Sequence, residues 1–205
     1  MTSSRRIFLS ALLIAFGVIA ARAQTQVLMT TAFGPDASPP ENTPIAQQWV
    51  TNIAAATTSL RLTFYDFTLN PVRDAIIAAK AANPDLDIRG VLDKSQITKP
   101  NVRAVACDAG AQFKYWDPPD TSDLVHHKFM IIDGETSHPT VITGSANFTV
   151  TAVRFNHENQ AAFTYVSGDT SFFDAYVNQF EAMWSDSFTF PPGASFKDYI
   201  PSPPC

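Results

Sequence analysis

Hydrophobic and polar residues alternate along the chain with two different periods. An apolar residue at every second position, or a short unbroken apolar run, predicts a strand, whereas apolar residues three and four positions apart predict a helix. Leu60, Leu62 and Phe64 follow the first rule, and the residues after Thr43-Pro44 follow the second. We expect strands at 27–33, 60–65, 86–92, 111–116, 124–132, 141–143 and 161–166, and helices from Pro44, from Asn70, at 100–108 and at 171–184.

Strands and helices that follow one another in this order are typical of layered α/β proteins. We therefore expect a single domain over residues 24–205, built as an α-β-α sandwich with helices on both faces of a mixed central sheet. The last segment, 185–205, is rich in Pro and Phe and is predicted to be an irregular, packed tail.

The strongest chemical signal lies in and after the predicted strand 124–132. His126, Lys128 and Asp133 follow the pattern H-x-K-x4-D, and residues 144–147 read G-S-x-N. Side chains alternate across a strand, so His126 and Lys128 are predicted to share one face while His127 points to the other. An imidazole nucleophile with ammonium, hydroxyl and amide donors is the set that phosphoryl transfer without a metal requires.

These two motifs resemble those of the phospholipase D superfamily, and their single copy resembles the small bacterial endonuclease-like members. The resemblance implies a phospholipase D-like fold and a covalent phosphohistidine at His126. It also implies that Lys128, Ser145 and Asn147 bind the phosphate oxygens, with Gly144 as a structural residue of the motif. The segment 134–143 is longer than the usual family spacing and is interpreted as a longer hairpin tip that affects the rim of the site.

The same resemblance implies roles for two acidic residues. Glu158 lies where the small bacterial members carry a glutamate that orients the nucleophilic histidine, although an exposed loop acid also fits this position. Asp133 is implied to be structural, through a salt bridge. No cofactor and no metal ion are expected, because no group of histidines or cysteines has metal-ligand spacing.

The single motif copy has a consequence for assembly. Transfer through a phosphohistidine needs one imidazole that attacks phosphorus and another that protonates the leaving oxygen. Since this chain holds one copy, we expect a homodimer with a composite site on its twofold axis, to which each protomer gives His126, Lys128 and Asn147.

Residues 1–23 have the features of an export signal. Arg5-Arg6 precedes an apolar run at 11–21, and Ala21-Arg22-Ala23 is a typical cleavage site. The paired arginines resemble the twin-arginine type of signal, so a periplasmic or secreted protein is expected. Together with residues 7–9, this run supplies about 14 apolar residues, which are too few for a stable membrane span.

The only two cysteines are Cys107 and Cys205. In an oxidising compartment they are able to form a disulfide that ties the tail to the domain. A buried free thiol at Cys107 fits the sequence equally well, because that residue lies on an apolar helical stripe.

The formal net charge of −5 narrows the choice of substrate. Removal of residues 1–23, which hold three arginines and no acids, would change it to −8. Nucleic-acid binding usually rests on a basic face. We therefore expect a secreted phospholipase D-like phosphodiesterase that hydrolyses a phospholipid head group. One alternative is a metal-independent nonspecific endonuclease, if Lys94, Lys99, Arg103, Lys114 and Arg154 gather on one face; another is an inactive phosphate- or lipid-binding module.

Overall fold

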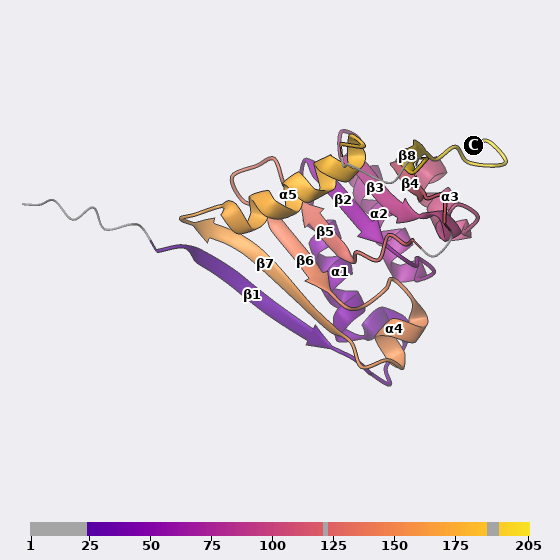
Figure 1. Cartoon of the computed structure of the whole chain (residues 1–205). Coiled ribbons are helices and arrows are strands. Elements are labelled where there is room, and N and C mark those ends of the chain that lie inside the picture. Colours follow the sequence, from indigo (N-terminus) through magenta and orange to yellow (C-terminus); the bar gives the residue numbers. More distant parts are fainter. Residues whose placement is uncertain (1–23, 121–122, 188–192) are drawn as a thin grey trace, which may run out of the picture.

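One mixed sheet runs through the centre of the molecule (Figure 1). The computed structural model describes residues 24–120, 123–187 and 193–205, so the predicted export signal at 1–23 lies outside the described residues. The sheet has eight strands in the order β1-β7-β6-β5-β2-β3-β4-β8. The strands are β1 (Gln26–Phe33), β2 (Ser59–Phe64), β3 (Asp87–Asp93), β4 (Gln112–Asp117), β5 (Phe129–Ile132), β6 (Thr140–Gly144), β7 (Asn159–Ser167) and β8 (Ser195–Asp198).

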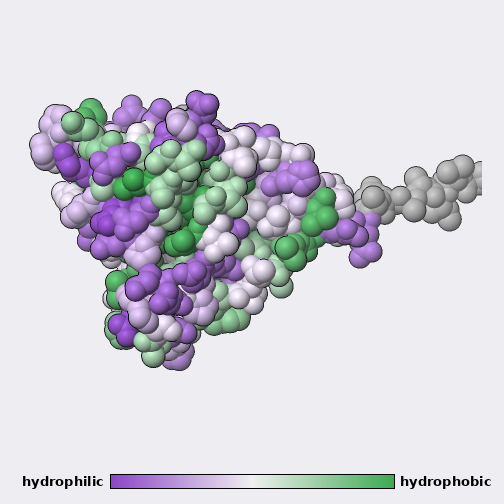
Figure 2. All heavy atoms as spheres, turned by 180° about the vertical axis from the view of Figure 1, so that it is seen from behind, coloured by the Kyte–Doolittle hydropathy of each residue, from purple (hydrophilic) through white to green (hydrophobic). Residues whose placement is uncertain are grey.

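Helices cover both faces of this sheet, which confirms the predicted layered fold. The helices are α1 (Pro44–Ala54), α2 (Asn70–Ala82), α3 (Pro100–Asp108), α4 (Val150–Arg154) and α5 (Ser171–Trp184), with short 3-10 turns η1 (Pro40–Asn42) and η2 (Lys94–Gln96). In Figure 1, α5 crosses the near face of the sheet and α1 and α2 lie behind it. Seen from behind, apolar residues gather near the centre of the helical face, with hydrophilic residues around them (Figure 2). No helix of the described residues is long and apolar enough to cross a membrane.

Strand β2 sets the direction of its neighbours. It pairs in parallel with β3 and antiparallel with β5, and all six of its residues are buried. Its side chains alternate between the core beneath α1–α3, which receives Leu62 and Phe64, and the side covered by α5. Because β3 runs parallel to β2 and β5 runs antiparallel to it, β2 and β3 end where β5 begins. We call this end of the sheet the His126 end, because His126 lies just before β5.

Three elements differ from the sequence prediction. The predicted strand 124–132 begins only at Phe129, because its partner β2 ends at Phe64 and the last paired residues are Thr63 and Phe129. The tail is not wholly irregular, since β8 pairs antiparallel with the exposed edge of β4. The short helix α4 was not predicted; the side chain of Thr149 caps it by accepting a hydrogen bond from Ala152 N at 3.1 Å.

The hairpin tip between β5 and β6 lies at the opposite end of the sheet from His126, so it does not shape the rim of the site as expected. Asp133 begins this tip, and its carboxylate accepts hydrogen bonds from the backbone N–H groups of Thr57, Thr58 and Ser59 at 2.7–3.0 Å. Within the described chain Asp133 has no ion pair, so the implied salt bridge is wrong and backbone hydrogen bonds replace it.

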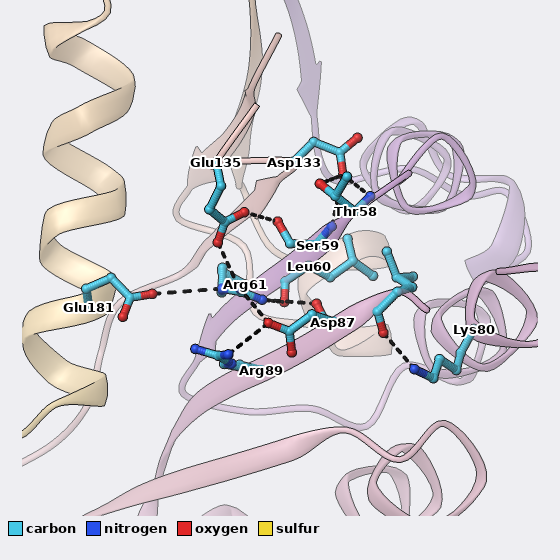
Figure 3. Close-up of polar contacts among 11 residues, drawn as sticks. Thr58, Ser59, Leu60, Arg61, Lys80, Asp87, Arg89, Asp133, Glu135 and Glu181 are labelled. Carbon is cyan, nitrogen blue, oxygen red and sulfur yellow. Dashed lines mark hydrogen bonds and ion pairs between the residues drawn. The ribbon is translucent and has the colours of Figure 1, made fainter. Parts of the chain in front are cut away.

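A buried arginine joins four elements at this same end (Figure 3). Arg61, on β2, is only 5% exposed. Its guanidinium forms ion pairs with Asp87 at 2.8 Å and Glu135 at 2.7 Å, and its Nε lies 3.9 Å from Glu181 on α5. Because a buried charge is tolerated only when it is paired, these carboxylates fix how the tip and α5 sit on the sheet.

A disulfide links Cys107 on α3 to Cys205, with the Cα atoms 5.3 Å apart. Arg103 supports the same tail by donating hydrogen bonds to the carbonyls of Pro203 and Pro204 at 3.2 and 3.3 Å. Of the two states that the sequence left open, the structure has the disulfide. It ties down the segment that covers the edge of β4.

The Asp133 carboxylate makes the stability of the fold depend on pH in the acid range. Burial raises the pKa of Asp133, but the hydrogen bonds from Ser59, Thr58 and Thr57 outweigh it and hold the pKa below its usual value of 3.8. Its contribution to stability is therefore present above about pH 4 and is lost as the pH falls through the lowered folded-state pKa. Asp133→Asn should lower the free energy of unfolding at pH 7 by about 2–3 kcal/mol and flatten its fall in acid. Urea denaturation at several pH values measures this, and unchanged acid dependence would contradict it.

The disulfide closes a long loop, with a sequence separation of 98 residues. Its removal in Cys107→Ser/Cys205→Ser should lower the free energy of unfolding by about 2–4 kcal/mol, since the unfolded chain gains freedom. Chemical denaturation of the oxidised wild type and the double variant checks this. Equal midpoints would mean that the tail is held by β8 and Arg103 alone.

Candidate active site

A buried carboxylate holds the segment that carries His126. Asp93, at the end of β3, is 3% exposed. One carboxylate oxygen accepts a hydrogen bond from Val125 N at 3.2 Å, and the other accepts one from Ser95 N at 2.9 Å. The backbone just before His126 is thereby attached to the end of the parallel strands. No role was predicted for Asp93, which directly follows the predicted strand 86–92.

His126 and Lys128 contact each other directly. The Lys128 Nζ lies 3.2 Å from Nδ1 and 3.3 Å from Nε2 of the His126 ring, and it donates a hydrogen bond to the His126 carbonyl at 3.0 Å. An ammonium group has no acceptor, so a hydrogen bond to the ring requires an unprotonated ring nitrogen. The Lys128 ammonium therefore lies within hydrogen-bond distance of both ring nitrogens, beside the imidazole that the motif implies as nucleophile. The predicted common face of the two residues is thus present, although the segment is not paired as a strand.

Tyr65 forms a wall beside both motif residues. Its ring centroid is 5.0 Å from that of His126, and the Lys128 Nζ is 5.7 Å from the centre of the Tyr65 ring. The ring face thus stabilises the ammonium by a cation–π contact and restricts the imidazole. Sequence alone placed Tyr65 only as the last residue of the predicted strand 60–65; its position next to the end of β2, beside the start of β5, is what brings it here.

The G-S-x-N segment turns at the end of β6, next to the beginning of β7. A Cβ atom on Gly144 would lie 2.1 Å from the Asn159 carbonyl oxygen, so this close approach requires glycine. The Phe148 N–H donates to the Asp66 carbonyl at 3.1 Å, which fixes the turn beside β2. Asn147 is half-buried there, and its Oδ1 has no hydrogen-bond partner among the described residues.

Glu158 contacts Ser145 rather than His126. The Ser145 hydroxyl donates to one carboxylate oxygen of Glu158, and Asn156 Nδ2 donates to the other at 3.1 Å. Within this chain the expected hydrogen bond between Glu158 and the His126 ring is not formed. The Ser145 hydroxyl is likewise engaged with Glu158, and its oxygen accepts from Asn159 N at 3.1 Å. Both groups lie at the His126 end, because β6 ends and β7 begins there.

Burial and neighbouring charges shift the pKa values of Lys128 and His127. Burial lowers the pKa of Lys128, and the Glu158 carboxylate raises it in part, so the net shift is downward. Burial also lowers the pKa of His127, and the nearby Lys128 and His126 lower it further.

A cleft of about 490 Å³ opens beside this cluster. It is lined by His126, His127, Lys128, Phe129, Thr143, Gly144, Ala175, Tyr176 and Gln179, the last three from α5.

The basic residues named from the sequence do not form an open cationic groove. They are held by separate partners: Lys94 by Asp117 at 2.5 Å, Lys99 by Asp66 at 3.9 Å, Lys114 by Asp198 at 3.9 Å, Arg103 by the tail carbonyls, and Arg154 by the Ala37 carbonyl at 3.2 Å. Among the described residues, no group of three or more His, Cys, Asp or Glu side chains is placed to hold a metal ion.

Comparison with known proteins gives a family and a fold. Residues 49–184 match the family model described as "Cardiolipin synthase, PLD-like domain". The mitochondrial cardiolipin hydrolase of Xenopus laevis is 27% identical over 135 residues, which are 65% of this chain and 58% of that protein. That of Xenopus tropicalis is 36% identical over 66 residues, which are 32% of this chain and 28% of that protein. The chain therefore spans well under two thirds of the length of these relatives.

Two solved structures share the fold. The phospholipase D family member Nuc from Salmonella typhimurium superposes with a TM-score of 0.64 and 22% identity, covering 85% of this chain and 99% of its own. NucT from Helicobacter pylori gives a TM-score of 0.61 and 16% identity, covering 78% and 97%. These likenesses confirm the predicted fold.

The Tyr65 ring leads to a prediction for the pKa of Lys128. Loss of the ring face in Tyr65→Leu should lower that pKa further, because a cation–π contact favours the charged amine. Tyr65→Phe keeps the ring face and should leave the pKa unchanged. NMR titration of the labelled lysine measures both variants; equal pKa values in Tyr65→Leu and the wild type would contradict the contact.

Proposed function

The chain belongs to the phospholipase D superfamily, within the family of cardiolipin synthase-type PLD-like domains, and on this basis we propose that it hydrolyses a phospholipid phosphodiester through a covalent phosphohistidine at His126. The observation that carries the proposal is the contact of Lys128 with the ring nitrogens of His126 in an open cleft. It sets the ammonium of Lys128 directly beside the imidazole of His126, so that a phosphate attacked by the ring would meet a cation.

The proposed reaction has two displacements at phosphorus. In the first, a ring nitrogen of His126 attacks phosphorus, a P–N bond forms, and the bond to the leaving alcohol oxygen breaks as that oxygen takes a proton. In the second, water attacks phosphorus, gives up a proton, and the P–N bond breaks to release the phosphate monoester. Lys128 and the amide of Asn147 would stabilise the charge on the nonbridging oxygens.

The proton for the leaving oxygen would come from a second imidazole. We propose that a second copy of the chain supplies it, in a homodimer whose composite site contains both copies of His126. The exposed position of His126 at one end of the sheet supports this, because a partner can reach it there. In such a dimer, Glu158 would orient the His126 imidazole of its own protomer or that of the partner.

A phospholipid is favoured over nucleic acid by the charge distribution. The chain has a net charge of −5, and most of its candidate basic residues are bound to carboxylates or carbonyls. Tight nucleic-acid binding draws on several free cations along one groove. The printed names of the curated relatives, cardiolipin hydrolases, agree with a phospholipid substrate. We further propose export to the periplasm or beyond, which rests on residues 1–23 alone.

The assay that tests this proposal uses purified protein in EDTA, offered phosphatidylcholine vesicles, cardiolipin vesicles and plasmid DNA side by side. We expect release of a phospholipid head group or alcohol, no nicking of plasmid, and at least a thousandfold loss of activity in His126→Ala, because the nucleophile is removed.

His127→Ala is the matched control, since it removes the neighbouring imidazole and leaves the motif intact. Plasmid nicking that depends on His126, without lipid cleavage, would replace the phospholipid proposal by the nuclease alternative. Activity lost in EDTA and restored by a divalent ion would contradict the metal-independent reaction. Binding of lipid without turnover would favour the inactive module.

A further inference from the structure

Two phenylalanine side chains are exposed at the His126 end of the sheet, on segments that flank Glu158. Phe33 ends β1, and Phe155 directly follows α4. Each is 63% exposed; among the exposed large hydrophobic side chains of the described residues, only Ile200, at 79%, is more so. Single apolar residues on a surface need no explanation, but two exposed aromatic rings on segments that flank Glu158 indicate a contact surface.

The segments that carry these rings contact each other. Gly34 N donates a hydrogen bond to the Glu158 carbonyl at 3.0 Å, and a Cβ atom on Gly34 would lie 2.9 Å from the Asn156 carbonyl oxygen. Phe33 precedes Gly34 and Phe155 precedes Asn156 in the chain. Both rings therefore border the strand start that holds Glu158 against Ser145.

A cation accompanies the rings. The guanidinium of Arg154 lies 5.2 Å from the centre of the Phe155 ring, and it donates a hydrogen bond to the Ala37 carbonyl at 3.2 Å. We call Phe33, Arg154 and Phe155 the phenylalanine rim. An apolar ring with a guanidinium on it suits a lipid interface, where the ring enters the acyl boundary and the cation meets the phosphates.

We propose that the phenylalanine rim inserts into the surface of a phospholipid bilayer and brings the His126 end of the sheet to the head-group phosphates. This inference rests on the proposed function and adds how a protein with this charge reaches its substrate. With a net charge of −5, the chain as a whole is not attracted to an anionic surface. Burial of the two rings therefore supplies the attraction, and binding persists at high salt.

The test compares Phe33→Ser/Phe155→Ser with the wild type in three measurements. Co-flotation with phosphatidylcholine/phosphatidylglycerol vesicles should fall at least tenfold in the variant and be insensitive to salt in the wild type. Hydrolysis of bis(p-nitrophenyl) phosphate, a soluble diester, should be unchanged, because no group at the reacting centre is altered. Light scattering should give the same oligomeric state for both proteins.

Leu28→Ser/Met29→Ser is the matched control, because these residues are 61% and 57% exposed on β1, in the half of the strand farther from Phe33. It should float with vesicles like the wild type. Equal flotation of the rim variant and the wild type, or equal loss in the control, would overturn the rim. A change of oligomeric state in the rim variant would do so too, and would assign the rim to a second copy of the chain. Vesicle binding by the wild type without lipid cleavage would leave the rim standing and contradict the proposed function instead.

Discussion

The pairing of β2 with β3 on one side and β5 on the other is the constraint on which the site depends. Because β2 and β3 are parallel and β5 is antiparallel, two strands end where the third begins. This brings Tyr65, Asp93 and His126 to the same end of the sheet from distant parts of the sequence. The far end is fixed separately by buried Arg61 and by Asp133, so the chemistry and the main polar anchors of the fold lie apart.

The site is held by short-range contacts that leave its reacting groups accessible. Asp93 fixes the backbone before His126, the Tyr65 ring supports the imidazole and the ammonium, and Gly144 lets the G-S-x-N turn approach β7. Each support is buried or half-buried, whereas His126 itself is exposed. Preorganised donors around an open nucleophile are suited to a substrate that is presented by a surface or by a second protomer.

Much of this architecture could be predicted from local patterns. Apolar periodicity gave the helices α3 and α5 with their observed bounds, and the spacing of His126 and Lys128 gave their common side. What the local pattern did not predict depends on contacts distant in sequence: the pairing of β8 with the edge of β4, the end of β2 that shortens β5, and the contact of Glu158 with Ser145. The disulfide also depended on such proximity, since the sequence fitted both a bonded and a free Cys107.

The central claim, that the His126 imidazole forms a covalent bond to phosphorus, is tested most directly by trapping the intermediate. The enzyme would be mixed briefly with phospholipid vesicles and quenched in alkali, in which a histidine phosphoramidate survives, and its peptides would be weighed by mass spectrometry. The account predicts a phosphatidyl adduct on His126 in the wild type and none in Lys128→Ala, where turnover is lost. An adduct on Ser145 or His127, or steady turnover with no adduct at all, would contradict it.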